Sequence, residues 1–175
     1  MPEPSARQQA GFTLVELVVG MLVLAIGITA LLQAFLGQVT MDEHARNLAW
    51  AMNDASRVME QIRQQNTGGG CTNPSVTPPA GFLSWNAWLA DVNGGGGKSI
   101  QPDPANNELV VATPPTGTGA APLTVTVAVC WRQRGRIIGE CLPNGAALIQ
   151  NPGAGGNPAI TESPAMVSTV ITCRP

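Results

Sequence analysis

The sequence is poor in charge, in aromatic rings and in the side chains that most often carry catalysis. Only 11% of its 175 residues are charged, the net charge is −2, and 4% are aromatic, with no tyrosine. Nothing in this composition suggests a basic stripe or patch for binding nucleic acid. The one histidine, His44, has no second histidine for a catalytic or metal-binding pair, and we expect it to be a solvated surface residue.

The motifs of common enzymes are also missing. The sequence contains neither G-x-S-x-G nor H-E-x-x-H, and the glycine run at 94–97 lacks the Lys-Ser/Thr pair of a phosphate-binding loop. Two acidic residues of the C-terminal part could still converge as a general acid/base pair. The candidates are Asp91, Asp103, Glu108, Glu140 and Glu162. We expect no enzymatic activity, no metal and no cofactor.

Cysteine is scarce too, and its placement is informative. The four cysteines are Cys71, Cys130, Cys141 and Cys173. They lie in a part of the chain rich in Gly and Pro, which favours disulfides in an oxidising compartment. No pair has the C-x2-4-C spacing of a zinc site, so we expect no metal there. The sequence leaves all three disulfide connectivities open.

One long apolar run, residues 12–36, is present, and its only charge is Glu16. A bilayer core requires about 20 predominantly apolar residues, so this run is long enough to span a membrane as a helix. A secretory signal would require small residues before its cleavage point, and the residues after the run do not provide them. A carboxylate at the bilayer centre costs about 2.5–3.5 kcal/mol. Glu16 is therefore either a functional, paired residue or one that snorkels to the membrane edge.

The segment GFTLVE, residues 11–16, followed by an apolar helix, strongly resembles the cleavage and methylation site of type IV pilins and pseudopilins. The resemblance implies that prepilin peptidase cuts between Gly11 and Phe12, removes a leader of residues 1–11, and leaves Phe12 as an N-methylated amino terminus. One departure is Ala10, where the family often has Lys or Arg; the only basic side chain of the leader is Arg7.

The same resemblance gives Glu16 a role in assembly. Cleavage would place an ammonium group on Phe12, four residues before Glu16 and on the same helical face. In a filament, the resemblance implies that the Glu16 carboxylate of an incoming subunit meets the amine of an assembled one and sets the axial register. The implied partners are other pilins or minor pilins. The implied location is the inner membrane of a bacterium, with the head in the periplasm, and then the pilus filament.

Downstream of the apolar run we expect an α+β pilin-like fold. Apolar residues at steps of three and four predict an amphipathic helix half over residues 37–67. Residues 68–175 are expected to form a disulfide-stabilised head. In it, residues 82–92 have helical spacing that places Phe82 and Val92 on one apolar side with the tryptophans.

Strand patterns predict an antiparallel sheet over residues 108–113, 123–132 and 166–173, with residues 142–165 as a loop. A tight turn centred on Gly135-Arg136 would place Cys130 opposite Cys141 and make a cross-strand disulfide geometrically possible. Cys71–Cys173 would then complete the set.

The stretches LAIGITALL, SWNAWLADVNGGGG and VTVAVCWRQRGR resemble the PilV-type minor pilins. This resemblance implies a minor pilin of a type IV pilus that joins a tip or priming complex. Pseudopilin I of a type II secretion system is an alternative, because it shares the cleavage motif and a similar helical segment around Arg57–Arg63. A lower alternative is a single-pass membrane-anchored periplasmic domain or enzyme.

Overall fold

The fold is described from a computed structural model of the chain. The residues whose structure is described are 13–68, 71–100, 107–113, 122–139, 141–145, 147–151 and 163–173. Gly11 and Phe12, and with them the predicted cleavage site, lie outside these ranges. The chain divides into two compact units, Met1–Glu43 and His44–Pro175, and each is described by itself.

Helix α1, Leu14–Gln65, supplies all the described structure of the first unit and the spine of the second. In the first unit its large apolar side chains are exposed; Leu14 is 81% and Leu31 73% accessible. This helix is long and apolar enough to cross a membrane. Its threonines hide their hydroxyl groups inside the helix: Thr29 Oγ1 donates to the carbonyl of Ala25 (3.0 Å) and Thr40 Oγ1 to that of Gly37 (2.7 Å). The exposed surface of this segment is thereby suited to hydrocarbon.

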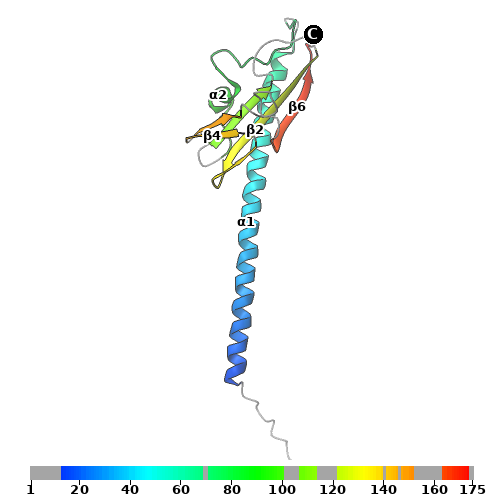
Figure 1. The fold of residues 1–175 in the computed structure, drawn as a ribbon. Coiled ribbons are helices and arrows are strands. Elements are labelled where there is room, and N and C mark those ends of the chain that lie inside the picture. Colours follow the sequence, from blue (N-terminus) through cyan, green and yellow to red (C-terminus); the bar gives the residue numbers. More distant parts are fainter. Residues whose placement is uncertain are drawn as a thin grey trace, which may run out of the picture. The chain divides into compact units, whose positions relative to one another are not determined.

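In the second unit, which we call the head, the later turns of α1 pack on an antiparallel sheet. The sheet strands are β1 (Glu108–Thr113), β2 (Leu123–Gln133), β3 (Arg136–Ile138) and β6 (Ala165–Ile171). β2 pairs with β1 along one edge, and with β6 and β3 along the other. Figure 1 shows β6 beside β2. The α+β pilin-like architecture predicted from the sequence is confirmed.

The core of the head lies between one face of β2 and the apolar stripe of α1. Val125, Val127, Val129 and Trp131 alternate along β2 and are fully buried, as the period of two predicts. Opposite them, α1 contributes small and medium side chains at helical spacing. These are Ala51, Ala55, Val58, Met59 and Ile62.

The short helix α2, Trp85–Ala90, covers part of the same core. It begins where the Ser84 hydroxyl accepts a hydrogen bond from the Ala87 N–H at 3.1 Å, which is an N-cap. Trp85 and Trp88 are buried edge to face, and Trp85 Nε1 donates to the Val76 carbonyl at 2.7 Å. The predicted helix over 82–92 is therefore too long. Val92 lies beyond its end and is 77% exposed, not on the buried side.

The turn between β2 and β3 differs from the predicted one by one residue. Its central residues are Arg134 (φ 48°) and Gly135 (φ 77°), and Gln133 pairs with Arg136. A type I′ turn, one of the two whose twist matches the strands, requires positive φ at both central positions, and here Arg134 adopts it ahead of the glycine. The prediction that placed Cys130 directly opposite Cys141 is wrong. Continuing the register places Gly139 opposite Cys130.

A second hairpin occupies part of the predicted loop over 142–165. Strands β4 (Cys141–Asn144) and β5 (Ala147–Gln150) pair with each other in a separate two-stranded sheet. Each strand has four residues and β4 contains Pro143, so neither gives the alternating pattern that identifies a strand in sequence. Apolar Leu148 turns inward and packs near Cys130 and Cys141.

Two disulfides fasten the head. Cys71–Cys173 joins the segment just after α1 to the end of β6, with Cα atoms 5.4 Å apart. Cys130–Cys141 joins β2 to β4, with Cα atoms 6.3 Å apart. Of the three connectivities that the sequence leaves open, the structure has this one.

Candidate functional site

The first turn of α1 contains a reciprocal set of hydrogen bonds between Thr13 and Glu16. The Glu16 N–H donates to Thr13 Oγ1 at 3.3 Å, and the Thr13 N–H donates to Glu16 Oε2 at 3.3 Å. The Thr13 hydroxyl also donates to Glu16 Oε2, at 3.3 Å. This is a capping box, in which side chains satisfy two backbone N–H groups that have no partner within the helix.

The capping box determines where the Glu16 carboxylate lies. It turns back toward the positive end of the helix dipole, where a negative charge is stabilised, and away from the apolar turns that follow. Glu16 is thus held at the N-terminal end of α1. The sequence analysis singled out Glu16 but missed Thr13. The T-x-x-E spacing of a capping box would have identified it.

In the head, Asp54 and Arg57 of α1 form a polar centre. It binds the loop over residues 94–100, which contains the four-glycine run and which we call the glycine loop. Asp54 is completely buried, accepts from the Ser99 N–H at 2.8 Å, and is paired with the Arg57 guanidinium. Arg57 also donates to the carbonyls of Gly95 (2.5 Å) and Gly97 (2.7 Å). The Arg57–Asp54 pair thus anchors a loop about forty residues further along the chain.

Glu108, at the start of β1, adds a second carboxyl group to this centre. It is 2% exposed, and its Oε2 accepts from the Ile100 N–H at 3.3 Å. Burial, together with the neighbouring Asp54, raises the pKa of the Glu108 carboxyl to about 9. At neutral pH Glu108 is therefore protonated. Of the five acids considered as catalytic candidates, Asp91 and Glu108 lie in the described ranges, and Asp103, Glu140 and Glu162 lie outside them. Glu108 meets the Asp54 carboxyl group, and both groups are sealed from solvent.

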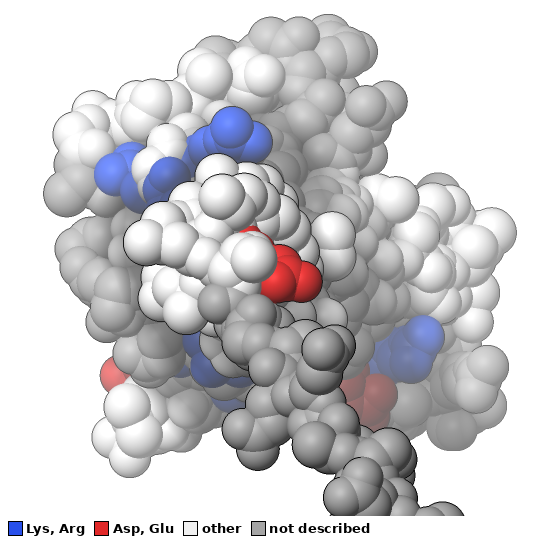
Figure 2. Space-filling view, turned by 90° about the horizontal axis from the view of Figure 1, so that it is seen from below, with Lys and Arg blue, Asp and Glu red and all other residues white. Residues whose placement is uncertain are grey.

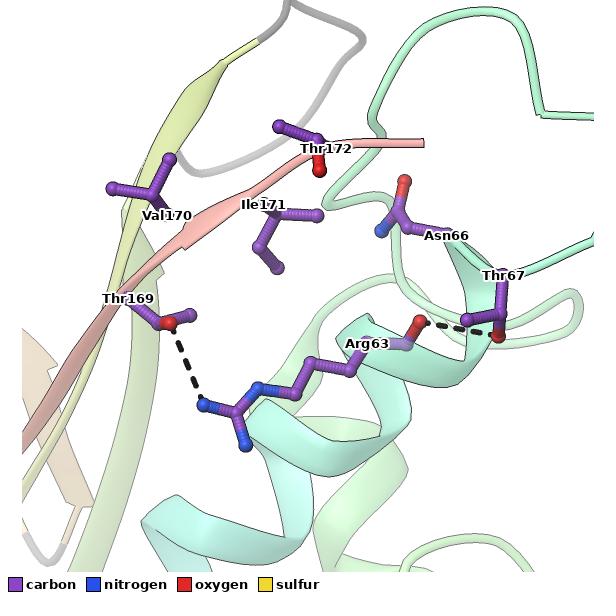
Figure 3. A pocket seen from close by; sticks show the side chains of 7 residues that line it. All are labelled: Arg63, Asn66, Thr67, Thr169, Val170, Ile171 and Thr172. Atoms are coloured by element: carbon purple, nitrogen blue, oxygen red, sulfur yellow. Dashed lines mark hydrogen bonds between the residues drawn. The ribbon is translucent and has the colours of Figure 1, made fainter. Parts of the chain in front are cut away.

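Among the described residues of the head, the surface hollows include the following two. One, of about 290 Å³, lies between the end of α1 and β6. In Figure 3 the Arg63 side chain reaches across it toward Thr169 (3.4 Å), and the Thr67 hydroxyl donates to the Arg63 carbonyl. The other, of about 370 Å³, lies between Leu83, the β1 edge and Ile149, and its lining residues include no charged side chain.

Neither hollow combines a nucleophile with a base, and both are lined mostly by threonine, amide and aliphatic groups. Within the described ranges, no three His, Cys, Asp or Glu side chains come together in a group that could hold a metal ion. His44 is exposed, as predicted, but it is not fully solvated, because its Nδ1 lies 3.1 Å from Oε1 of Gln133.

Comparison with protein families agrees with the N-terminal geometry. Residues 6–32 match the model of the prokaryotic N-terminal methylation motif. This match covers residues 6–11 of the predicted leader, the capping box and most of the apolar run. It supports a type IV pilin-like protein with a prepilin-type amino terminus, which is processed by prepilin peptidase. No curated protein and no solved structure gave a significant match.

Proposed function

We propose that this chain is a minor pilin of a type IV pilus, of the PilV type, and that it joins a tip or priming complex through α1. The observation that carries the proposal is the methylation motif with Glu16 held in a capping box at the start of an exposed apolar helix. An assembly subunit accounts for all of these features. A simple membrane anchor would need only the apolar residues.

The proposed mechanism begins with Glu16 at the edge of the apolar helix in the membrane-held subunit. There the hydroxyl and N–H of Thr13 satisfy its carboxylate. Prepilin peptidase hydrolyses the Gly11–Phe12 bond, and the new amine of Phe12 is N-methylated while it keeps its positive charge. During assembly the amine of a neighbouring subunit pairs with the Glu16 carboxylate. A misaligned subunit leaves that carboxylate uncompensated in apolar surroundings, so the pairing selects one axial register.

Pseudopilin I of a type II secretion system remains the second candidate, because the same motif and helix serve both kinds of filament. What supports a structural role over an enzymatic one is that buried Asp54 and Glu108 and half-buried Arg57 are engaged with the loop over residues 94–100 and with one another. We therefore propose a subunit without catalytic activity, located in the inner membrane with its head in the periplasm and then in the filament.

The first experiment is the intact mass of the protein from cells with and without an active prepilin peptidase. Loss of residues 1–11 with gain of one methyl group, only when the peptidase is present, is the expected result. Persistence of the full-length chain in both strains would overturn the proposal and leave a membrane-anchored domain.

The second experiment separates assembly from processing. Glu16→Ala is expected to be cleaved normally but to be absent from sheared filaments, whereas Glu60→Ala, an exposed acid of the same helix in the head, is expected to be incorporated normally. Normal incorporation of Glu16→Ala would contradict the register mechanism. Co-purification of the wild-type chain with pilus subunits, or with secretion components, distinguishes the two filaments.

A further inference from the structure

Strand β6 lies at one edge of the sheet (Figure 1), with one side unpaired among the described strands. In an antiparallel pair, successive residues turn their backbone N–H and C=O groups alternately toward the partner strand and away from it. Val129 of β2 turns its groups toward β6, because its partner on β1, Val110, donates to the Asn86 side chain and not to β2. Following the register from there, the residues of β6 that turn their groups away from β2 are Met166, Ser168 and Val170.

The open side of β6 carries none of the features that usually protect an edge strand. Such strands are normally shielded by charged side chains, by proline or by a bulge. The sequence of β6, AMVSTVI, has no charge and no proline, and its pairing with β2 is continuous from Ala165 to Ile171. The outward-facing residues are exposed, Met166 by 42% and Val170 by 59%. The open side is therefore accessible to another chain.

The hollow of about 290 Å³ runs beside this strand, because four consecutive residues, 169–172, line it together with the end of α1. In Figure 3 the Thr169 side chain points toward Arg63, and Val170 points to the other side of the strand. The Arg63 side chain is 53% exposed; it donates to Thr169 at 3.4 Å, and the Glu60 carboxylate lies 3.9 Å away. A guanidinium has five N–H donors, so Arg63 has donors left for a further acceptor.

Arg63 gives this edge a charge that β6 itself lacks. Charged residues are sparse in the protein, and Figure 2 shows them, on the face seen from below, as a few separate groups among uncharged residues. A strand with a carboxylate beside Arg63 is complementary to this edge, because paired hydrogen bonds between guanidinium and carboxylate are stronger than neutral ones. A second copy of β6 has no Asp or Glu and offers no such group. The charge therefore favours a different partner strand over self-pairing.

We propose that the open side of β6 binds an extended segment of a partner protein, uncharged except for one Asp or Glu, as an added antiparallel strand. The inference goes beyond the proposed function and rests on the head alone. The backbone groups of Met166, Ser168 and Val170 pair with the segment, and these main-chain hydrogen bonds supply the affinity. Its acidic side chain lies opposite Thr169, where the Cβ atoms of facing residues are about 4.5–5.5 Å apart, within reach of Arg63. The carboxylate thus selects the partner and sets its register.

The test uses the purified full-length chain in detergent and the capped probe peptide acetyl-TVTETVT-amide, whose only charge is its glutamate. Two matched probes replace the glutamate by glutamine, or carry an N-methyl group on every residue, which keeps the side chains but removes all N–H donors. Isothermal titration calorimetry measures the affinity, and hydrogen–deuterium exchange of the peptide covering β6 locates the contact. We expect roughly tenfold tighter binding of the glutamate probe than of the glutamine probe, much weaker binding of the N-methylated probe, and slower exchange in β6 when the glutamate probe is bound.

The variant Arg63→Gln separates the charged part of the contact from the backbone part, and Arg46→Gln is its control. Arg46 is also an exposed arginine of α1, but it lies over the Trp50 ring and outside the lining of the hollow. Arg63→Gln should bind the glutamate and glutamine probes equally, whereas Arg46→Gln should keep the roughly tenfold preference.

Failure of the glutamate probe to bind, a preference for glutamate that survives Arg63→Gln, or equal binding of the N-methylated probe would each overturn the proposal. Protection of β6 that rises with protein concentration in the absence of any probe would overturn it as well, because that result would assign the edge to a second copy of the chain.

Discussion

Asp54 on α1 accepts hydrogen bonds from both the backbone N–H and the hydroxyl of Ser99, which lies forty-five residues further along the chain. Together with Arg57, which binds the carbonyls of Gly95 and Gly97, it fixes the loop after α2 to the spine of the head. The loop is also tied to α2, because the Gly95 and Gly96 N–H groups donate to the carbonyls of Trp88 (2.9 Å) and Asp91 (3.1 Å). The charged hydrogen bonds are what join it to α1.

Substituting Asp54→Asn should therefore destabilise the head. The amide leaves Arg57 without its counter-charge, and lost hydrogen bonds to charged groups cost about 2–3 kcal/mol. Glu60→Gln is the control: its pair with Arg63 is exposed and 3.9 Å long, and such pairs contribute less than about 1 kcal/mol. The measurement is urea unfolding followed by tryptophan fluorescence, since all four tryptophans lie in the head. Equal midpoints for the two variants would contradict the role assigned to Asp54.

The free energy of unfolding of the head should fall as pH rises from about 4.5 to about 9, because Glu108 has a raised pKa in the folded state. The ordinary pKa of a glutamate is 4.5, and in the folded head the pKa of Glu108 is about 9. Between these values the folded chain holds a proton that the unfolded chain has released, so unfolding becomes more favourable with each step in pH. Glu108→Gln keeps a neutral group that can donate toward Asp54, and it should flatten the decline. An unchanged pH dependence of the urea midpoint in this variant would refute the assignment.

Gly139→Ala should be more harmful than Gly145→Ala, although both glycines have positive φ (94° and 59°). A Cβ at position 139 would lie 2.7 Å from the Cys130 Cβ, whereas at position 145 it would meet nothing within 4 Å. We expect a loss of roughly 2–4 kcal/mol at 139, from backbone strain and overpacking together, and of about 1 kcal/mol at 145. Thermal unfolding of both variants in the same detergent checks the difference, and a smaller effect at 139 would be inconsistent with this packing.

Removing the Cys71–Cys173 bridge should cost more than removing Cys130–Cys141. The two bridges have sequence separations of 102 and 11 residues, and the loop-entropy account assigns about 4.7 kcal/mol to a loop near 100 residues and about 3 kcal/mol to one of 15. Paired Cys→Ser variants, compared by urea unfolding under non-reducing conditions, measure the order. Peptide mapping of the unreduced wild-type protein checks the pairing itself, and a Cys71–Cys130 peptide would contradict it.

The parts of the fold that could be predicted from sequence are those in which one pattern repeats. β2 alternates between core and exterior for most of its length, and the core residues of α1 follow helical spacing, so both elements were predictable from periodicity alone. The start of the helix was predictable from the motif around Glu16, although the Thr13 contact was overlooked.

Other parts depend on contacts between residues far apart in sequence. The register of the β2–β3 turn was set by Arg134 adopting a positive φ, for which the sequence gives no signal when a glycine follows directly. The β4–β5 hairpin consists of strands too short to show a period. The partnership of Asp54 with Glu108 exists only because β1 and the glycine loop meet α1 at the same place.

The Cys71–Cys173 bridge also determines how the head would carry a mechanical load. α1 ends at Gln65, six positions before Cys71. At the other end of the head, β6 ends at Ile171, two positions before Cys173. Tension between α1 and anything attached at the carboxyl end of the chain would pass through that short segment and the sulfur–sulfur bond. The sheet, enclosed between the two cysteines, would bear almost none of it. Reduction would reroute the force through the β2–β6 ladder, which would then have to unzip before the chain could extend.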